Sequence, residues 1–437
     1  MTRFFFALCA TVLLALPARA AVDIQEVTSP GGITAWLVEE PSIPFTALEL
    51  RFRGGTSLDR DGKRGAVNLM TGLLEEGSAD LDSRGFAVAR DNLAASFDFD
   101  SYDDAVSVSA RFLSENREEA LALLRKALIE PRFDQTAMDR VRAQVLASIR
   151  SDLKDPDEIA SDAFNAIIYG DHPYGSNEAG TVETVSALTR DDIVQAHQDT
   201  MALDNLYVSA VGDITAAELG ALLDDLLGAL PAEAAPMPPR LDITTEADIT
   251  IVPFETPQSV AVFGHRGIDQ DHPDFFAAFI LNNIFGASGF ESRLMDEVRE
   301  KRGLTYGIYT FLMSKDLAET MVGRLASANG RIAEAVDVIQ SEWARMQTEG
   351  VTAEELADAK TYLTGAYPLR FDGNGRIANI LVGMQMTGLP IDYAETRNDR
   401  INAVSLEEIN RVASELMQPD ALQFVIVGQP EGLSSTN

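Results

Sequence analysis

The chain has 437 residues, enough for two or three domains with substantial cores. Its 68 acidic and 35 basic side chains give a formal net charge of −33, which argues against nucleic acid as a ligand because phosphate binding needs basic surface. The single cysteine, Cys9, excludes an intramolecular disulfide.

Residues 1–20 have the pattern of a removable secretion signal. Arg3 precedes an apolar run at residues 4–16, and residues 18–20 (Ala-Arg-Ala) form a small-x-small cleavage site. The run is too short to span a bilayer comfortably, and no later stretch is long and apolar enough, so we expect no membrane span after cleavage. A bacterial periplasmic location follows, with retention of the segment as an uncleaved anchor as the alternative.

The rest of the chain consists of two copies of one unit. Residues 206–213 (Leu-Tyr-Val-Ser-Ala-Val-Gly-Asp) match residues 422–429 (Leu-Gln-Phe-Val-Ile-Val-Gly-Gln) at an offset of 216. The same offset relates the helical stretches before them, where it pairs Leu188 with Val404, Asp191 with Glu407, Asp192 with Glu408, Ile193 with Ile409 and Met201 with Met417. These matches indicate a duplicated domain.

Strands and helices follow one another in the same order in both copies. Alternating apolar residues predict the strands and amphipathic periodicity predicts the helices. In chain order the elements are a strand at 46–53, helices at 115–129 and 134–149, a strand at 259–264, and helices at 331–346 and 352–367. This order is not a regular β-α-β-α alternation. We therefore predict an α+β fold of two similar sandwich domains, each a mixed, largely antiparallel sheet with helices on one side.

Four prolines mark the junction between the copies. Pro231, Pro236, Pro238 and Pro239 lie among alanines, a composition typical of a linker. The expected organisation is a signal at 1–20, an N-terminal domain at 21–229, a linker at 230–241 and a C-terminal domain at 242–437.

The most specific pattern of the chain lies in the second copy, at residues 288–309. Ser288 and Glu291 have the spacing of a capping box at the start of a helix. Three apolar residues then recur at helical spacing, namely Leu294, Met295 and Val298. The pattern predicts a helix that begins near residue 288.

Gly303 stands where a left-handed residue would end this helix, and residues 304–312 are rich in β-formers. Arg299 would therefore lie near the helix end and Tyr306 at the start of a strand, so a tight turn could bring them side by side. Spacing alone favours another interpretation, a solvated helix cation and a core tyrosine.

This segment resembles the C-terminal-domain signature of the insulinase/pitrilysin family of zinc peptidases. The resemblance is carried by residues 293–306 (Arg-Leu-Met-Asp-Glu-Val-Arg-Glu-Lys-Arg-Gly-Leu-Thr-Tyr) and extends diffusely over most of the mature chain. In that family an Arg and a Tyr seven residues apart reach across a cleft to the substrate. The resemblance assigns these catalytic contacts to Arg299 and Tyr306.

The zinc motif of the family is missing from the matching positions. In active members a helix of the first domain carries His-x-x-Glu-His, which supplies two zinc ligands and the general base, and a Glu about 76 residues further on completes the ligand set. Alignment of the following glycine with Gly77 places this motif at residues 68–72. The degenerate positions are Asn68, Thr71, Gly72 and Ser148. They bring neither imidazole nor carboxylate, so we expect no metal site in this chain.

The resemblance implies a non-catalytic, substrate-binding subunit of a heterodimeric periplasmic zinc peptidase. Two domains would form half of a clamshell, and a homologous partner with His-x-x-Glu-His would supply zinc, while this chain binds no cofactor and hydrolyses no peptide alone. The alternatives are a non-enzymatic scaffold or binding protein of the same fold, a homodimer, and an enzyme with an unfamiliar site. The four histidines, His172, His197, His265 and His272, are too scattered to suggest such a site.

Overall fold

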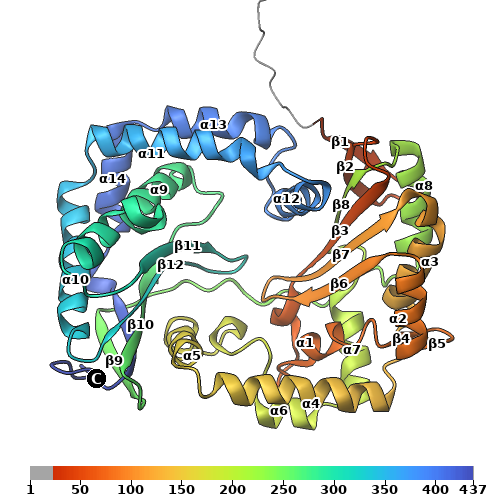
Figure 1. Ribbon diagram of the computed structural model, residues 1–437, viewed down its shortest axis with the longest axis horizontal. Coiled ribbons are helices and arrows are strands. Elements are labelled where there is room, and N and C mark those ends of the chain that lie inside the picture. The colour runs from red at the N-terminus through yellow and green to blue at the C-terminus, as the bar shows by residue number, and fades with distance from the viewer. Residues whose placement is uncertain (1–22, 437) are drawn as a thin grey trace, which may run out of the picture.

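The structure is a computed structural model that describes residues 23–436. The predicted secretion signal, residues 1–20, lies outside the described residues. The described chain forms two α+β units, each built on its own mixed sheet (Figure 1). None of the helices between residues 23 and 436 is long and apolar enough to cross a membrane.

The first unit contains a six-stranded sheet in the order β1-β2-β8-β3-β7-β6. Its strands are antiparallel except for the pair β2 and β8, which run parallel. The strand bounds are β1 Gln25–Thr28, β2 Thr34–Glu39, β3 Phe45–Arg53, β6 Ser96–Ser101, β7 Ala105–Leu113 and β8 Leu206–Gly212, with a separate two-stranded ribbon of β4 Gly77–Ser78 and β5 Leu81–Asp82.

The second unit repeats this topology. Its five strands have the order β11-β12-β10-β13-β9, and only β13 and β9 are parallel. The bounds are β9 Asp248–Pro253, β10 Gln258–Arg266, β11 Ile308–Ser314, β12 Glu319–Ala328 and β13 Gln423–Gly428. The order corresponds strand by strand to β6-β7-β3-β8-β2, so the duplication predicted from the sequence is confirmed.

Fourteen α-helices accompany the sheets in the described part of the chain. Those before the linker are α1 Ala66–Thr71, α2 Ser83–Asn92, α3 Arg117–Ile129, α4 Gln135–Asp152, α5 Pro156–Tyr169, α6 Val182–Ala187, α7 Arg190–Thr200 and α8 Ala216–Leu227. Those after it are α9 Phe275–Asn282, α10 Ile332–Glu349, α11 Ala353–Ala366, α12 Asn374–Met386, α13 Tyr393–Ala403 and α14 Leu406–Leu416. Two π-helical stretches, η4 Asn283–Ala287 and η6 Met295–Glu300, follow α9.

The two units exchange one helix each. Helix α5 of the first unit packs on β10 and β13 of the second sheet, and α12 of the second unit packs on β3 and β8 of the first sheet (Figure 1). The other face of each sheet carries helices of its own unit, as predicted. The prediction of helices on one side of each sheet is therefore incomplete, because a helix from the other unit covers part of the second face.

The tips of two hairpins also join the units. Lys315, in the turn between β11 and β12, forms an ion pair of 2.5 Å with Asp103 in the turn between β6 and β7. The Lys315 ammonium lies 4.5 Å from the ring centre of Tyr174, whose hydroxyl donates a hydrogen bond to Asp104. Burial by itself lowers the pKa of Lys315, but Asp103, Tyr169 and Asp104 together outweigh it and leave that pKa above its ordinary value.

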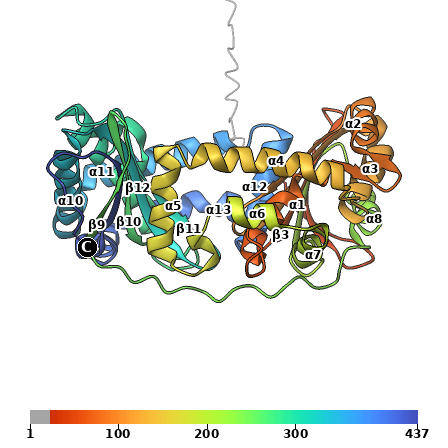
Figure 2. The same cartoon turned by 90° about the horizontal axis from the view of Figure 1, so that it is seen from below.

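Residues 228–247, between α8 and β9, contain no helix or strand. They include the proline-rich stretch 230–241 and pass along one side of the molecule from one unit to the other (Figure 2).

Candidate functional site

The cap of the helix in the predicted site segment lies four residues later than the sequence pattern suggests, at Ser292 and not at Ser288. Ser288 has φ −83° and ψ 18°, not the extended backbone of a helix cap, and its side chain makes no cap hydrogen bond. A 3₁₀ turn, Gly289–Glu291, follows instead. Ser292 adopts the extended conformation, and its hydroxyl accepts the amide of Met295 at 3.4 Å. The capping box at Ser288 and Glu291 is therefore wrong, and helical structure begins at residue 293.

The helix that carries Arg299 is fixed by its apolar side and ends as predicted. Leu294, Met295 and Val298 are fully buried. Its last turns are π-helical, a geometry that is rare and frequent at functional sites. Gly303 then takes φ 60°, and its amide donates to the carbonyl of Arg299 at 2.7 Å.

The residues around Tyr306 are tied to the neighbouring strand by side-chain hydrogen bonds. The Thr305 hydroxyl donates to the carbonyl of Ala326 in β12 at 2.7 Å, and the Ser327 hydroxyl donates to the carbonyl of Leu304 at 2.5 Å. These bonds take the place of ladder pairing, so β11 begins at Ile308 and not at residue 304 as predicted. The backbone on either side of Tyr306 is therefore held while its side chain projects outward.

Arg299 and Tyr306 lie side by side. The guanidinium carbon of Arg299 is 5.0 Å from the centre of the Tyr306 ring, within cation–π range. The Arg299 side chain is 24% exposed and forms an ion pair with Glu300 at 3.5 Å, whereas Tyr306 is 88% exposed. Interpretation of Tyr306 as a core residue is thus wrong, because its side chain is presented to solvent, whereas the Arg299 side chain beside it is largely buried.

A second arginine of the segment has a purely structural position. Arg293 forms two parallel bonds with Glu355 at the start of α11, of 2.5 and 2.7 Å, and donates to the carbonyl of Gly350 at 2.9 Å. Burial raises the pKa of Glu355, but the bonds from Arg293 and Thr352 outweigh it and bring that pKa to about 2. This pair anchors the start of the segment, so Arg299 is positioned from both ends.

The strand after Tyr306 carries a row of apolar side chains that the sequence reasoning missed. Tyr309, Phe311 and Met313 of β11 are 39, 46 and 43% exposed, while the alternate residues Ile308 and Thr310 are buried and Leu312 is half-buried. The alternation is visible in the sequence, but it does not tell which face is covered. We call these three residues the apolar row.

The positions of the missing zinc motif lie on and just beyond α1. The Asn68 amide donates to the Ser101 hydroxyl at 3.2 Å, and the buried Thr71 hydroxyl donates to the carbonyl of Asn68 at 2.9 Å. Gly72 follows the last residue of α1, and a Cβ there would lie 3.1 Å from Val141 of α4. Ser148 is exposed two turns further along α4, about 10 Å from Val141, and its hydroxyl bonds to Asp152.

These residues do not fit a zinc ion. Asn68 and Thr71 are engaged in hydrogen bonds, Gly72 has no side chain, and Ser148 offers only a hydroxyl. Within residues 23–436 no group of three or more His, Cys, Asp or Glu side chains is placed to hold a metal.

The histidines are used in the structure. Nε2 of His197 bonds to the carbonyl of Leu128 at 2.8 Å, and the indole N–H of Trp343 donates to Nε2 of His265 at 2.9 Å. The other two, His172 and His272, each accept a nearby backbone amide through Nδ1.

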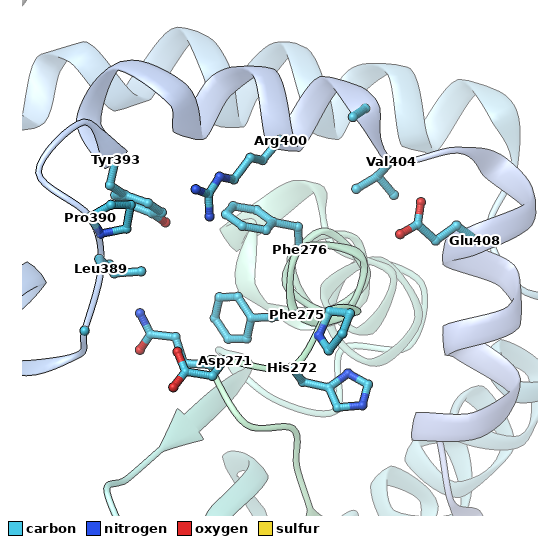
Figure 3. A pocket seen from close by; sticks show the side chains of 14 residues that line it. Asp271, His272, Phe275, Phe276, Leu389, Pro390, Tyr393, Arg400, Val404 and Glu408 are labelled. Carbon is cyan, nitrogen blue, oxygen red and sulfur yellow. The ribbon is translucent and has the colours of Figure 1, made fainter.

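A separate cavity of about 470 Å³ lies between the loop before α9, the turn after α12, and helices α13 and α14 (Figure 3). Arg400 lines it, with its guanidinium 5.9 Å from the Phe276 ring centre and 5.6 Å from that of Tyr393. Neither Arg299, nor Tyr306, nor any of the degenerate motif positions lines this cavity.

Two family models match the chain. Residues 35–182 match the insulinase family, peptidase family M16, and residues 187–363 match the peptidase M16 inactive domain. Between them the two matches span most of the chain.

Relatives match over nearly the full length. A Helicobacter pylori protein named non-peptidase homolog YmxG is 27% identical over 98% of each chain. A probable mitochondrial-processing peptidase subunit beta of Schizosaccharomyces pombe is 23% identical over 94% of this chain and 93% of its own. The crystal structure titled peptidase M16 inactive domain from Pseudomonas fluorescens superposes with a TM-score of 0.87 at 28% identity, over 93% of this chain and 98% of that one.

Proposed function

Because the chain belongs to the insulinase family of peptidases, family M16, we propose that it is a non-catalytic subunit that holds peptide substrate for a partner bearing His-x-x-Glu-His. Two observations support this role. The chain offers no ligand set for zinc at the positions where the family carries it, and it keeps the Arg and Tyr of the second domain next to each other.

The pair of Arg299 and Tyr306 is the observation that carries the proposal. A tyrosine ring that is 88% exposed contributes little to the stability of the unit, yet the turn beneath it is secured by two hydrogen bonds to β12. A guanidinium stands 5.0 Å from the same ring. The segment therefore holds an exposed phenol beside a partly exposed guanidinium, and the exposure of the tyrosine suits a ligand and is not required by packing.

Both side chains are suited to a peptide carbonyl. The guanidinium and the phenol hydroxyl donate hydrogen bonds and can converge on an oxygen on which negative charge develops during hydrolysis. Fixed donors of this kind typically stabilise the transition state by about 3–4 kcal/mol. In the proposed complex the partner supplies zinc and the general base, while Arg299 and Tyr306 position the substrate.

The proposal includes a heterodimer in the periplasm. Each subunit would form half of a clamshell, and the secretion signal at residues 1–20 would direct this chain to that compartment. A relative named as a peptidase subunit, subunit beta of the mitochondrial-processing peptidase, is consistent with assembly from more than one chain.

Reconstitution with the partner tests this function. The chain is co-purified from the native periplasm, the associated His-x-x-Glu-His protein is identified, and hydrolysis of a quenched-fluorescence peptide is measured for the pair. Arg299→Ala and Tyr306→Phe are expected to lower kcat/KM by about 100-fold with the complex intact by gel filtration. Arg84→Ala and Tyr362→Phe, at an exposed arginine of α2 and an exposed tyrosine, serve as matched controls and should leave the rate unchanged. Unaltered kinetics in both site variants would remove the catalytic contribution.

A second candidate is a non-enzymatic scaffold or binding protein of the same fold. The name non-peptidase homolog, given to the Helicobacter pylori relative, favours it. The neighbouring genes and the proteins that co-purify with the chain distinguish the two functions. A scaffold would co-purify without any His-x-x-Glu-His protein and would show no peptidase activity in any complex, whereas the proposed subunit would show both.

A further inference from the structure

The cavity between the loop before α9, the turn after α12, and helices α13 and α14 has the size and lining of a small-molecule site. Its volume of about 470 Å³ falls within the range of roughly 300–1,000 Å³ that ligand pockets span. Phe275, Phe276, Leu389 and Tyr393 supply an apolar and aromatic wall. Among the described residues that line the cavity, Arg400 is the only arginine or lysine. An apolar wall with few polar groups is typical of a site for an organic molecule.

The guanidinium of Arg400 has aromatic neighbours but no acceptor for its hydrogen bonds. Figure 3 shows it between the rings of Phe276 and Tyr393, whose centres lie 5.9 and 5.6 Å away. Within residues 23–436 no carboxylate pairs with it, and no carbonyl or side chain accepts its N–H groups. A guanidinium that contacts aromatic rings can still bind a carboxylate through its planar fork of donors. Arg400 is therefore a charged group that awaits a partner.

A second arginine keeps the wall behind the cavity positive. Arg397, one turn before Arg400 on α13, is only 6% exposed, and it donates to neutral oxygen atoms, the carbonyl of Leu363 at 3.3 Å and the amide of Asn398 at 3.4 Å. Burial raises the pKa of the Tyr393 phenol, and the charges of Arg397 and Arg400 partly oppose this rise. Two arginines thus act on a residue that lines the cavity, in a chain whose net charge is −33.

The duplication supplies an internal comparison. Helices α1 and α7 pack together in the first unit as α9 and α14 do in the second, and a cavity of about 360 Å³ lies between the loop before α1 and α7. The two cations that line it are both paired, Lys63 with Asp192 at 2.9 Å and Arg60 with Asp199 at 2.7 Å. The fold thus permits such a cavity with its cations neutralised by the chain itself. The unpaired Arg400 is not a requirement of the fold, so it needs another explanation.

The charges around the cavity favour a ligand with a single negative charge. Asp271 and Glu408 line it together with Arg400. A phosphate dianion would be repelled by these two carboxylates, with one guanidinium in the lining to offset them. A carboxylate carries one charge and matches a guanidinium through two parallel hydrogen bonds. The aromatic wall then suits a carboxylate that is attached to an aromatic body.

We propose that this cavity binds a small carboxylic acid with an aromatic body, its carboxylate paired with Arg400 and its ring against Phe275 and Phe276. Figure 3 shows both phenylalanine rings on the side of the cavity to which the guanidinium points. A free aromatic acid and the C-terminal residue of a peptide both carry this chemistry. The site is independent of the proposed substrate-holding role, since neither Arg299 nor Tyr306 lines the cavity.

Ligand binding to the purified full-length chain tests the inference without any partner. The probe is N-acetyl-phenylalanine, titrated to about 5 mM and followed by ligand-observed NMR at an ionic strength of about 0.15 M. N-acetyl-phenylalaninamide lacks the charge and N-acetyl-glycine lacks the ring. The probe should bind at least about tenfold more tightly than either.

A fourth compound distinguishes the two sources of the carboxylate. 3-Phenylpropionate has the ring and the carboxylate but no peptide group. An affinity equal to that of the probe assigns the cavity to free aromatic acids. A weaker affinity, still above that of the amide, assigns it to the C-terminal residue of a peptide.

Matched arginine variants locate the site. Arg400→Gln removes the charge at an exposed position and should weaken binding of the acid at least about tenfold, so that the acid and the amide bind equally. Arg400→Lys keeps the charge without the planar fork and should bind the acid with intermediate affinity. The control is Arg84→Gln, at an exposed arginine of α2, which should change binding less than about twofold. Far-UV circular dichroism and the urea midpoint check that the variants fold.

Three results would overturn the inference. They are equal affinity of the native chain for the acid and the amide, no detectable binding of the acid at the highest concentration, and unchanged binding of the acid in Arg400→Gln. None of these measurements requires a partner or peptidase activity. Failure of the proposed function would therefore leave this site untouched, and failure of the site would leave the roles of Arg299 and Tyr306 as proposed.

Discussion

Replacement of Lys315 by methionine tests how strongly the two units are held together. The Lys315 side chain is 17% exposed and that of Asp103 is 18% exposed, with 2.5 Å between their charged atoms. Removal of one partner of a buried pair typically costs 3–5 kcal/mol. We expect a cost about 1 kcal/mol smaller here, because Arg64 remains 3.2 Å from Asp103 and partly compensates its charge. Methionine retains contact with the rings of Tyr169 and Tyr174. We therefore expect Lys315→Met to lower the free energy of unfolding by about 2–4 kcal/mol.

The assay is equilibrium urea denaturation followed by far-UV circular dichroism and tryptophan fluorescence. The control is Lys126→Met, which removes a surface ion pair of 2.8 Å with Asp80 whose side chains are 36 and 75% exposed, and which should cost no more than about 1 kcal/mol. A double-mutant cycle with Asp103→Asn isolates the pair itself. Equal losses in the two lysine variants, or a coupling energy near zero in the cycle, would refute the view that these hairpin tips lock the units.

Three further predictions concern pH, backbone strain and metal. Burial lowers the pKa of His265 to about 4. Between about pH 6.5 and 4 the unfolded chain therefore binds more protons than the folded chain, and the free energy of unfolding falls as pH falls. In His265→Gln the pH dependence of the free energy of unfolding over this window, measured by urea denaturation at each pH, should decrease by up to about 1.4 kcal/mol per pH unit. Gly303→Ala should destabilise the chain by about 1–2 kcal/mol, because a φ of 60° is strained for alanine; nothing lies within 4 Å of a Cβ there, so a clash adds nothing. Gly383→Ala within α12, where the space is also open, should stabilise the chain by about 0.5–1 kcal/mol in the same assay. Dialysis against a chelator should leave the melting temperature unchanged, and elemental analysis should find no stoichiometric zinc; one tightly held zinc per chain would contradict the reading of Asn68 and Ser148.

Much of the fold could be predicted because its signals are local. The strand expected at 46–53 is β3, Phe45–Arg53, and the helix expected at 134–149 is α4, Gln135–Asp152. The periodicity of apolar residues indicates which side of an element faces a core, and it can be read without knowing which element packs against that side. The duplication extended each assignment to the second copy.

The boundaries of the site segment were less predictable. Ser288 has the right spacing to Glu291 for a capping box, but the preceding π-helix η4 leaves it in a conformation that cannot cap. Strand β11 starts later than its β-formers suggest because the Thr305 hydroxyl bonds to β12. In both places a contact with a neighbouring element decided between local alternatives of similar stability.

The sequence by itself determined the family resemblance and the duplicated α+β architecture, since these depend on residue type and spacing. The pairing of Arg299 with Tyr306 came from the resemblance, because spacing alone favoured another interpretation. Only the tertiary structure decided which surfaces are exposed. The exchange of α5 and α12 covers the centre of each sheet and leaves β11 free, so Tyr309 and Phe311 are exposed although their alternation would equally suit a buried face. The exposure of a strand residue depends on which helix from a distant part of the chain packs against the strand. No local sequence pattern indicates how far such a helix, here α5, extends across the sheet.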